Sequence, residues 1–262
     1  MAAAAPLVFI TGASSGIGQA LAQRFHDAGW RLALVARRTG EIEAWAAQRG
    51  IAIDGDGCAI HGADVTDTDA IVAAGAACIA RQGVPDVVIA NAGISFGIDT
   101  AERRDVDVFA RVLAVNNTGL VATFHPFVAA MRKRGSGRLV GISSVAGIRG
   151  LPGHGAYCAS KAGAIAYCES LRGELRGTGV RVVTICPGYI DTPLTRGNRY
   201  AMPFLMPADV FAERAFRAIE SGTSYRVIPW QMGIVARLMR VLPDAVFDRL
   251  AQGRGRKRRL GE

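Results

Sequence analysis

A glycine-rich turn between a short apolar run and a helical pattern constrains the fold of this chain most. The run Leu7–Ile10 is typical of a buried β-strand, and residues 19–28 carry apolar positions at helical spacing. The turn between them reads Thr11-Gly12-Ala13-Ser14-Ser15-Gly16-Ile17-Gly18. A strand, a glycine-rich turn and a helix in this order form a phosphate cradle, because glycine allows close approach and the helix start offers free N–H groups.

The spacing of these glycines, Gly-x-x-x-Gly-x-Gly, differs from two common phosphate-binding motifs. It is not Gly-x-Gly-x-x-Gly, and no Gly-Lys-Ser/Thr follows as in a Walker loop. A turn of this composition also occurs where only tight packing is needed. We favour phosphate binding because a strand and a helix flank the turn in the required order.

Strand-type runs alternate with helical patterns along most of the chain. The candidate strands are Leu7–Ile10, Arg31–Ala36, Cys58–Gly62, Asp86–Ala90, Arg138–Ser143, Val180–Cys186 and Tyr225–Ile228. Helices are expected between them, including a long one over about 105–134 and another over about 156–176. The alternation predicts a Rossmann-type, doubly wound α/β fold, with a seven-stranded parallel sheet and helices on both faces. The ligand is then expected at the carboxyl ends of the strands.

Tyr157 and Lys161 are one helical turn apart and are the strongest candidates for chemistry. On a helix, both side chains leave the same face. A cation about 4 Å from a phenol contributes roughly 4 kcal/mol at an effective dielectric of about 20, and one pKa unit corresponds to about 1.4 kcal/mol. Lys161 is therefore expected to bring the pKa of Tyr157 from about 10 to about 7. The alternative is an exposed helical pair without a role.

Two arginines at the end of the second candidate strand bear on the choice of nucleotide. In NAD-binding folds, an acidic residue about 20 residues past the glycines contacts the ribose 2′-hydroxyl, whereas an arginine accommodates a 2′-phosphate. This chain has Ala36 followed by Arg37 and Arg38. The pattern predicts NADP(H) in preference to NAD(H), with Arg37 as the main contact and Arg38 as support. Under the alternative, both are ordinary surface charges.

Together these motifs resemble the short-chain dehydrogenase/reductase family in its compact single-domain form, from about Leu7 to about Tyr225. The resemblance makes the glycine turn the cofactor loop. It implies these further cofactor contacts: Asp64 and Val65 at the adenine, Asn91, Ala92 and Gly93 after the fourth strand, and Pro187, Gly188 and Thr192 beside the nicotinamide. It also implies hydride transfer between nicotinamide C4 and a carbonyl carbon.

The same resemblance implies a catalytic set of Asn116, Ser144, Tyr157 and Lys161. Tyr157 would give a proton to the carbonyl oxygen, and Ser144 would donate a hydrogen bond to it. Lys161 would also bind the nicotinamide ribose, and Asn116 would hold a water that links Lys161 to solvent. Ser144 is selected by its distance from Tyr157, and Ser143 is expected to end the strand and orient its neighbour.

Residues 191–206 are expected to form a mobile lid, because two prolines and a glycine interrupt the segment. Its apolar residues predict an apolar pocket: Leu194, Met202, Phe204, Leu205 and Met206. Cys158 is interpreted as packing, and His154 is expected on a solvent-facing loop rather than at the substrate mouth. The predicted substrate is an apolar or lipid-like ketone, aldehyde or alcohol. A 3-oxoacyl-carrier-protein reductase and a non-catalytic NADP(H)-binding regulator or scaffold remain alternatives.

The candidate catalytic domain covers residues 1–252 and includes an amphipathic C-terminal segment, which a basic tail follows. Residues 230–250 predict two short amphipathic helices divided by Pro243, and the basic tail 253–262 is expected to be disordered. One hypothesis is peripheral contact with anionic lipid, and another is attraction to an acidic protein such as an acyl carrier. A core cap or a subunit interface is the structural alternative. Nucleic acid is not expected, since no recognition motif accompanies the charge.

The length of the chain suits one α/β domain with a large core. The chain has 262 residues, a formal net charge of +9 and 50% hydrophobic residues, and its N-terminal apolar run is expected to be the first strand rather than a signal peptide. The five cysteines form no Cys-x-x-Cys pair and fit reduced thiols in the cytoplasm. No cluster has metal-ligand spacing. The resemblance implies a homodimer or homotetramer, and small residues on one face of the helix that carries Tyr157 would permit the close packing.

Overall fold

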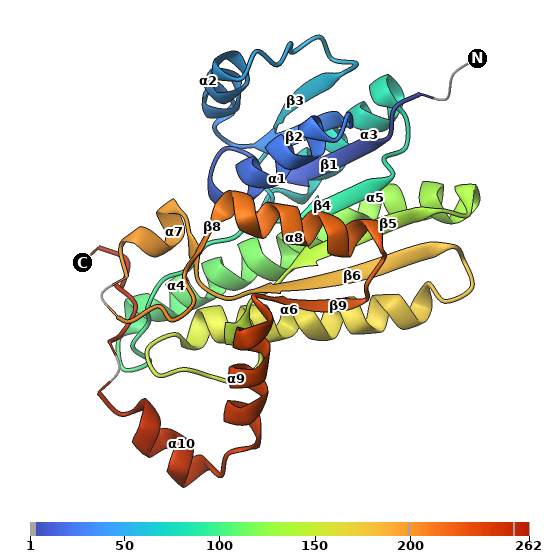
Figure 1. Cartoon of the computed structure of the whole chain (residues 1–262). Coiled ribbons are helices and arrows are strands. Elements are labelled where there is room, and N and C mark those ends of the chain that lie inside the picture. Colours follow the sequence, from blue (N-terminus) through green and yellow to red (C-terminus); the bar gives the residue numbers. More distant parts are fainter. Residues whose placement is uncertain (1–3, 199, 254, 262) are drawn as a thin grey trace.

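The protein is built on one parallel sheet, seen in a computed structural model that describes residues 4–198, 200–253 and 255–261 (Figure 1). The strand order is β3-β2-β1-β4-β5-β6-β9, and every pairing in the sheet is parallel. The strands are β1 (Leu7–Thr11), β2 (Arg31–Ala36), β3 (Cys58–Gly62), β4 (Val87–Ala90), β5 (Gly137–Ile142), β6 (Val180–Pro187) and β9 (Tyr225–Ile228). The predicted Rossmann-type α/β fold with seven parallel strands is confirmed.

Helices cover both faces of this sheet. They are α1 (Gly16–Asp27), α2 (Thr39–Gln48), α3 (Thr68–Gln82), α4 (Arg103–Leu113), α5 (Gly119–Arg134), α6 (Gly155–Glu174) and α8 (Ala208–Glu220). Val8 and Ile10 of β1 pack with residues of α1, α2 and α8, whereas Leu7 and Phe9 pack with residues of α3, α5 and α6. Neighbouring strand residues point to opposite faces, so a strand covered on both sides is apolar throughout.

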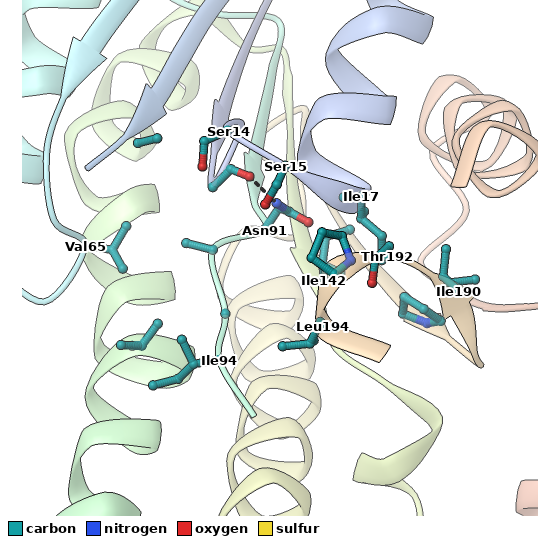
Figure 2. A pocket seen from close by; sticks show the side chains of 18 of the residues that line it. Ser14, Ser15, Ile17, Val65, Asn91, Ile94, Ile142, Ile190, Thr192 and Leu194 are labelled. Atoms are coloured by element: carbon teal, nitrogen blue, oxygen red, sulfur yellow. Dashed lines mark hydrogen bonds between the residues drawn. The ribbon is translucent and has the colours of Figure 1, made fainter. Parts of the chain in front are cut away.

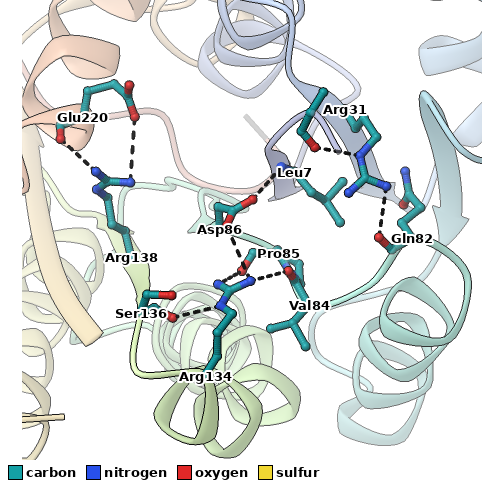
Figure 3. A network of polar contacts seen from close by, with 11 residues as sticks. Leu7, Arg31, Gln82, Val84, Pro85, Asp86, Arg134, Ser136, Arg138 and Glu220 are labelled. Carbon is teal, nitrogen blue, oxygen red and sulfur yellow. Dashed lines mark hydrogen bonds and ion pairs between the residues drawn. The ribbon is translucent and has the colours of Figure 1, made fainter. Parts of the chain in front are cut away.

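The amino ends of the strands are tied together by polar contacts (Figure 3). Asp86, just before β4, accepts a hydrogen bond from the Leu7 N–H at 2.9 Å. Arg134 ends α5 and donates to the carbonyl oxygens of Val84 and Pro85 at 2.7 and 2.6 Å. Its guanidinium also lies 3.4 Å from the Asp86 carboxylate. These contacts fasten one edge of the sheet and leave the carboxyl edge for the ligand.

The long helix expected over residues 105–134 is two helices, because a π-helical turn at Ala114–Thr118 joins α4 to α5. Such turns insert one residue into a helix and are frequent at functional sites. By length and composition alone, the whole run Arg103–Arg134 could cross a membrane, but half of its most apolar window is buried. Its buried residues, such as Phe124 and Phe127, belong to the core beneath the sheet.

The C-terminal region contains α9 (Trp230–Val241) and α10 (Asp244–Ala251), with Pro243 between them as predicted. The predicted disorder of the tail is wrong for residues 255–261, which return to lie beside α4 (Figure 1). The Gly97 N–H donates to the Arg258 carbonyl at 2.7 Å, and Arg259 Nε lies 2.7 Å from the Asp105 carboxylate. Acidic side chains thus order this basic tail. Residues 254 and 262 lie outside the described residues.

Candidate active site

A cavity of about 420 Å³ opens at the carboxyl edge of the sheet, between the loops that follow β1, β2, β4 and β6 (Figure 2). It is lined by the residues assigned above to the cofactor, except for Thr11, Ala13 and Gly18 of the glycine turn. The assigned residues that line it are Gly12, Ser14, Ser15, Gly16, Ile17, Arg37, Arg38, Asp64, Val65, Asn91, Ala92, Gly93, Tyr157, Lys161, Pro187, Gly188 and Thr192. Residues separated by up to 180 positions in sequence therefore enclose one space at the edge where a ligand is expected.

The glycine loop has the backbone shape that its sequence requires. Gly12 and Gly16 have φ values of +68° and +57°, a region that side chains disfavour. Gly18 stands behind the loop, and a Cβ on it would lie 2.2 Å from the Gly12 carbonyl oxygen. Its role is therefore to let α1 pack against the loop, not to contact a ligand. The Ser15 side chain makes no capping hydrogen bond, so it leaves the first N–H groups of α1 available for an anion.

Asn91 fixes the glycine loop to the end of β4. Its Nδ2 donates to the carbonyl oxygens of Thr11 and Gly12 at 3.0 and 3.2 Å, and its N–H lies 3.2 Å from the Thr11 hydroxyl. Figure 2 shows Asn91 beside Ser14 and Ser15 at the cavity wall. The residue thus shapes the glycine loop from the adjacent strand.

Arg37 and Arg38 follow β2 directly and line the same cavity. Their side chains are 58% and 65% exposed, so both guanidinium groups remain hydrated. Arg37 lies 3.4 Å from the Asp64 carboxylate, and Arg38 lies 3.2 Å from Glu41. Surface ion pairs of this kind contribute only about 0–1 kcal/mol. A phosphate could therefore replace the carboxylate partner of either arginine at small cost.

Ser144, Tyr157 and Lys161 come together on the wall of the cavity. Lys161 is 5% exposed, and its Nζ donates to the Ile142 carbonyl oxygen at 2.8 Å. The side chains of Ser144 and Tyr157 are hydrogen-bonded to each other. Ser143 donates to the Lys161 carbonyl oxygen at 2.7 Å, which agrees with a structural interpretation of this serine.

The predicted tuning of Tyr157 by Lys161 is wrong for the chain as the structure describes it. Burial raises the pKa of Tyr157 to about 12, and its hydrogen bond with Ser144 offsets only part of that rise. Burial also lowers the pKa of Lys161 to about 8. The Lys161 Nζ lies 5.7 Å from the centre of the tyrosine ring and is turned to Ile142. Loss of water around both groups therefore outweighs the attraction expected from their spacing.

Asn116 lies inside the π-helical turn and is 1% exposed. Its Oδ1 accepts from the Ile94 N–H at 2.9 Å, and its Nδ2 donates to the Ile94 carbonyl and to the Ser160 hydroxyl at 3.0 and 2.9 Å. The amide thereby fixes the loop after β4 against α6, one residue before Lys161. The water expected at Asn116 stays a prediction.

A second cavity, of about 540 Å³, shares Ser144 and Tyr157 with the first. Its apolar walls come from α9 through Met232, Val235 and Met239, and its outer side includes residues of the C-terminal tail. The two cavities therefore adjoin at the serine and the tyrosine, and they also share Gly188, Leu194 and Thr195. The participation of α9 and the tail was missed, because no local motif signals that these segments return to the site.

The interpretation of His154 as solvent-facing is wrong. The residue is 8% exposed, lines the second cavity, and places Nε2 3.3 Å from the Tyr200 hydroxyl. Burial lowers its pKa, so the imidazole is neutral at neutral pH. Its position one turn before Tyr157, where α6 begins, was the signal available in the sequence.

The predicted lid, residues 191–206, runs from the end of β7 (Ile190–Asp191) through α7 (Pro193–Arg196) to the start of β8 (Met206–Pro207). Residue 199 lies outside the described part. Of its five apolar candidates only Leu194 lines the second cavity. Phe204 and Leu205 are half exposed, and Met206 packs into the core because β8 pairs with β7. The prediction is therefore wrong for four of the five, including Met202.

Comparison with known proteins agrees with this geometry. The family model for short chain dehydrogenases matches residues 6–202. An uncharacterized oxidoreductase of Myxococcus xanthus (strain DK1622) is 39% identical over 246 residues, which cover 93% of this chain and 95% of the relative. Dehydrogenase/reductase SDR family member 7B of Bos taurus is 33% identical over a stretch that covers 97% of this chain and 82% of the bovine protein.

A solved structure extends the comparison to three dimensions. The alcohol dehydrogenase from the archaeon Thermococcus sibiricus complexed with 5-hydroxy-NADP has a TM-score of 0.74 and 26% identity, covering 86% of this chain and 96% of the other. The sheet order, the glycine loop and the serine–tyrosine–lysine wall are thus accompanied by similarity along nearly the whole length. The chain belongs to the short-chain dehydrogenase/reductase family of oxidoreductases, which act on CH–OH groups with nicotinamide cofactors.

Proposed function

We propose that this protein is an NADP(H)-dependent oxidoreductase that interconverts a ketone or aldehyde and the corresponding alcohol on an apolar substrate. The observation that carries the proposal is the junction of the two cavities at Ser144 and Tyr157. A nucleotide in the first cavity and a carbonyl compound in the second would meet where a hydrogen-bond donor and a proton donor stand side by side.

The residues at the junction have distinct tasks in the proposed reaction. When bound, the nicotinamide supplies or accepts the hydride. Because burial raises the pKa of Tyr157 to about 12, the phenol is protonated at neutral pH and holds the proton that the carbonyl oxygen needs during reduction. Ser144 donates a hydrogen bond to the same oxygen as negative charge develops there.

Lys161 and Asn116 have supporting roles next to Ser144 and Tyr157. The ammonium group of Lys161 has three N–H donors. One of them donates a hydrogen bond to the Ile142 carbonyl oxygen. The others are available to the ribose hydroxyls of the cofactor and to a water chain. Asn116 holds the neighbouring backbone through Ile94 and Ser160, so it acts as a positioning residue.

The preference for NADP(H) rests on Ala36, Arg37 and Arg38. The last residue of β2 is Ala36 and has no carboxylate that would repel a 2′-phosphate, and both arginines line the nucleotide cavity. The archaeal alcohol dehydrogenase with a similar fold was solved with an NADP derivative, which supports the same choice. A guanidinium binds phosphate with two parallel hydrogen bonds.

The proposal is tested by NADPH oxidation against a panel of apolar ketones and aldehydes, with Tyr157→Phe as the matched variant. Removal of a general acid is expected to lower kcat by about 10²- to 10⁴-fold without changing NADPH affinity. Turnover of 3-oxoacyl thioesters alone would favour the carrier-protein reductase instead. NADPH binding without turnover of any carbonyl would favour the non-catalytic regulator.

The outer face of α9 supports peripheral contact with a membrane. Trp230 and Leu238 are 62% and 60% exposed, and Arg237 and Arg240 lie exposed on the same helix. We expect the protein to pellet with phosphatidylserine vesicles and a Trp230→Ser/Leu238→Ser variant to stay in solution. Val106→Ser, which removes an exposed valine elsewhere, is the control. Equal and negligible pelleting of all three proteins would contradict the expectation.

A homodimer or homotetramer is expected to form through α6. The small residues on this helix are exposed in the chain and would permit close packing: Ala159, Ala162, Gly163 and Ala166. Sedimentation analysis tests the expectation, and a monomer at micromolar concentration would contradict it.

A further inference from the structure

The wall of the proposed substrate cavity contains basic side chains. Its described lining includes Arg149, His154 and Lys257, and it includes no aspartate or glutamate. The rest of its wall is largely apolar, from α9, the loop before α6 and the lid. A cavity of this size suits a small organic ligand. The charges therefore bear on what kind of group the ligand carries.

Two of these three groups are already neutral or compensated. Arg149 lies 2.8 Å from the Asp244 carboxylate and stacks over the Phe247 ring at 4.3 Å. His154 lies between the Pro152 carbonyl at 2.9 Å and the Tyr200 hydroxyl at 3.3 Å, and burial keeps it uncharged at neutral pH. Neither group needs an anionic ligand.

Lys257 differs from both. Its Nζ donates to the Leu194 carbonyl oxygen at 2.9 Å and to the Asn198 Oδ1 at 2.7 Å, both of which are uncharged acceptors. Within the described ranges, no carboxylate lies within 4.0 Å of this ammonium group. The third N–H donor remains for another acceptor.

Partial burial of such a cation is costly without a counter-charge. Burial lowers the pKa of Lys257, in keeping with that cost. The tail nevertheless holds the residue in place, because Arg256 lies 3.8 Å from Asp99 and Arg259 is paired with Asp105 on either side of it. The tail thus presents a fixed cation to an apolar cavity.

We propose that the substrate is an amphiphilic anion, with an apolar body beside α9 and a carboxylate or phosphate group that Lys257 binds. The inference rests on the proposed function, because the same cavity must deliver a carbonyl or alcohol group to Tyr157. Lys257 is then a specificity-determining residue supplied by the C-terminal tail.

Binding to the NADP⁺-loaded protein tests this without any need for turnover. Decanoate, decyl phosphate and decanol share one apolar chain, and calorimetry compares their affinities for wild type, Lys257→Met and Arg258→Met. Arg258 carries an exposed charge one position away and does not line the cavity. We expect the two anions, or one of them, to bind wild type and Arg258→Met about tenfold or more tightly than decanol, and Lys257→Met to lose that preference.

The contrast between the two anions identifies the head group. Equal binding of decanol and both anions to wild type would overturn the proposal. So would an equal loss of all three ligands in Lys257→Met, since the lysine would then only fasten the lid. Failure of NADPH oxidation with every carbonyl tested would instead count against the proposed function, and it would leave the calorimetric comparison intact.

Discussion

The nucleotide side and the substrate side of the site are held by different kinds of contact. On the nucleotide side, steric demands in the glycine loop dictate the backbone, as at Gly12 and Gly18. On the substrate side, pairs far apart in sequence hold the segments together. Lys257 contacts Leu194, 63 positions away, and Arg259 contacts Asp105, 154 positions away. The first side is thus fixed by the core, and the second depends on docking of the tail.

Removal of the tail should affect the substrate side strongly and leave the nucleotide side nearly unchanged. A 1–252 protein loses the contacts of Lys257 and Arg259 that hold the lid and the tail edge of the cavity. We expect kcat/KM for the carbonyl substrate to fall about 100-fold, since small misplacements cost that much, while NADPH affinity stays within about twofold. Steady-state kinetics and fluorescence titration measure the two quantities. A proportional loss of NADPH binding would show that the two sides are not independent.

A methyl group in the glycine loop should impair nucleotide binding, in contrast to removal of the tail. Gly18→Ala places a Cβ against the Gly12 carbonyl, so we expect a loss of about 1–3 kcal/mol in the free energy of unfolding and at least about tenfold in NADPH affinity. Gly40→Ala is the control, because nothing lies within 4 Å of its Cβ, and it should stabilise α2 by up to about 1 kcal/mol. Denaturant titration of both variants checks the difference. Unchanged stability of Gly18→Ala would refute the steric argument.

Arg37→Ala tests whether the nucleotide cavity binds a 2′-phosphate. The variant should lose about tenfold in affinity for NADPH and little for NADH, because the guanidinium is exposed and contributes at the lower end of charged hydrogen bonds. Arg49→Ala, another exposed arginine, should change neither affinity. Equal losses for both nucleotides in Arg37→Ala would contradict a 2′-phosphate contact.

The pH dependence of nucleotide binding reports on Lys161. Burial lowers its pKa to about 8, so the ammonium is present below pH 8 and is lost as the pH rises through that value. NADPH binding should weaken a few-fold between about pH 7 and 9 in wild type and stay flat in Lys161→Met. By linkage, the buried lysine also makes stability rise with pH from about 8 toward its unfolded pKa of about 10.4. If NADPH binding had the same pH dependence in wild type and Lys161→Met, the titrating group would be one other than Lys161.

What the sequence alone predicted follows the same division. The strand ranges agree with the structure to within one residue, because apolar runs act locally. The residues predicted to bind the cofactor, from Gly12 to Thr192, line one cavity with the exception of Gly18, and their contact with a cofactor stays a prediction. The tail, His154 and Met206 were misjudged, because their environment depends on distant acidic residues, on the start of α6 and on the pairing of β7 with β8. The pKa of Tyr157 was misjudged because spacing reveals a neighbouring charge but not the loss of water around it.

Transfer of deuterium from NADPH labelled at nicotinamide C4 tests whether Tyr157 protonates a carbonyl oxygen beside a bound nicotinamide. Wild-type protein should place the label on the carbonyl carbon of an apolar ketone, as seen by mass spectrometry, and Tyr157→Phe should bind the nucleotide equally but transfer almost none. A ketone reduced without the label from either C4 position, or undiminished transfer by Tyr157→Phe, would contradict the assignment of Tyr157 as the proton donor beside a bound nicotinamide.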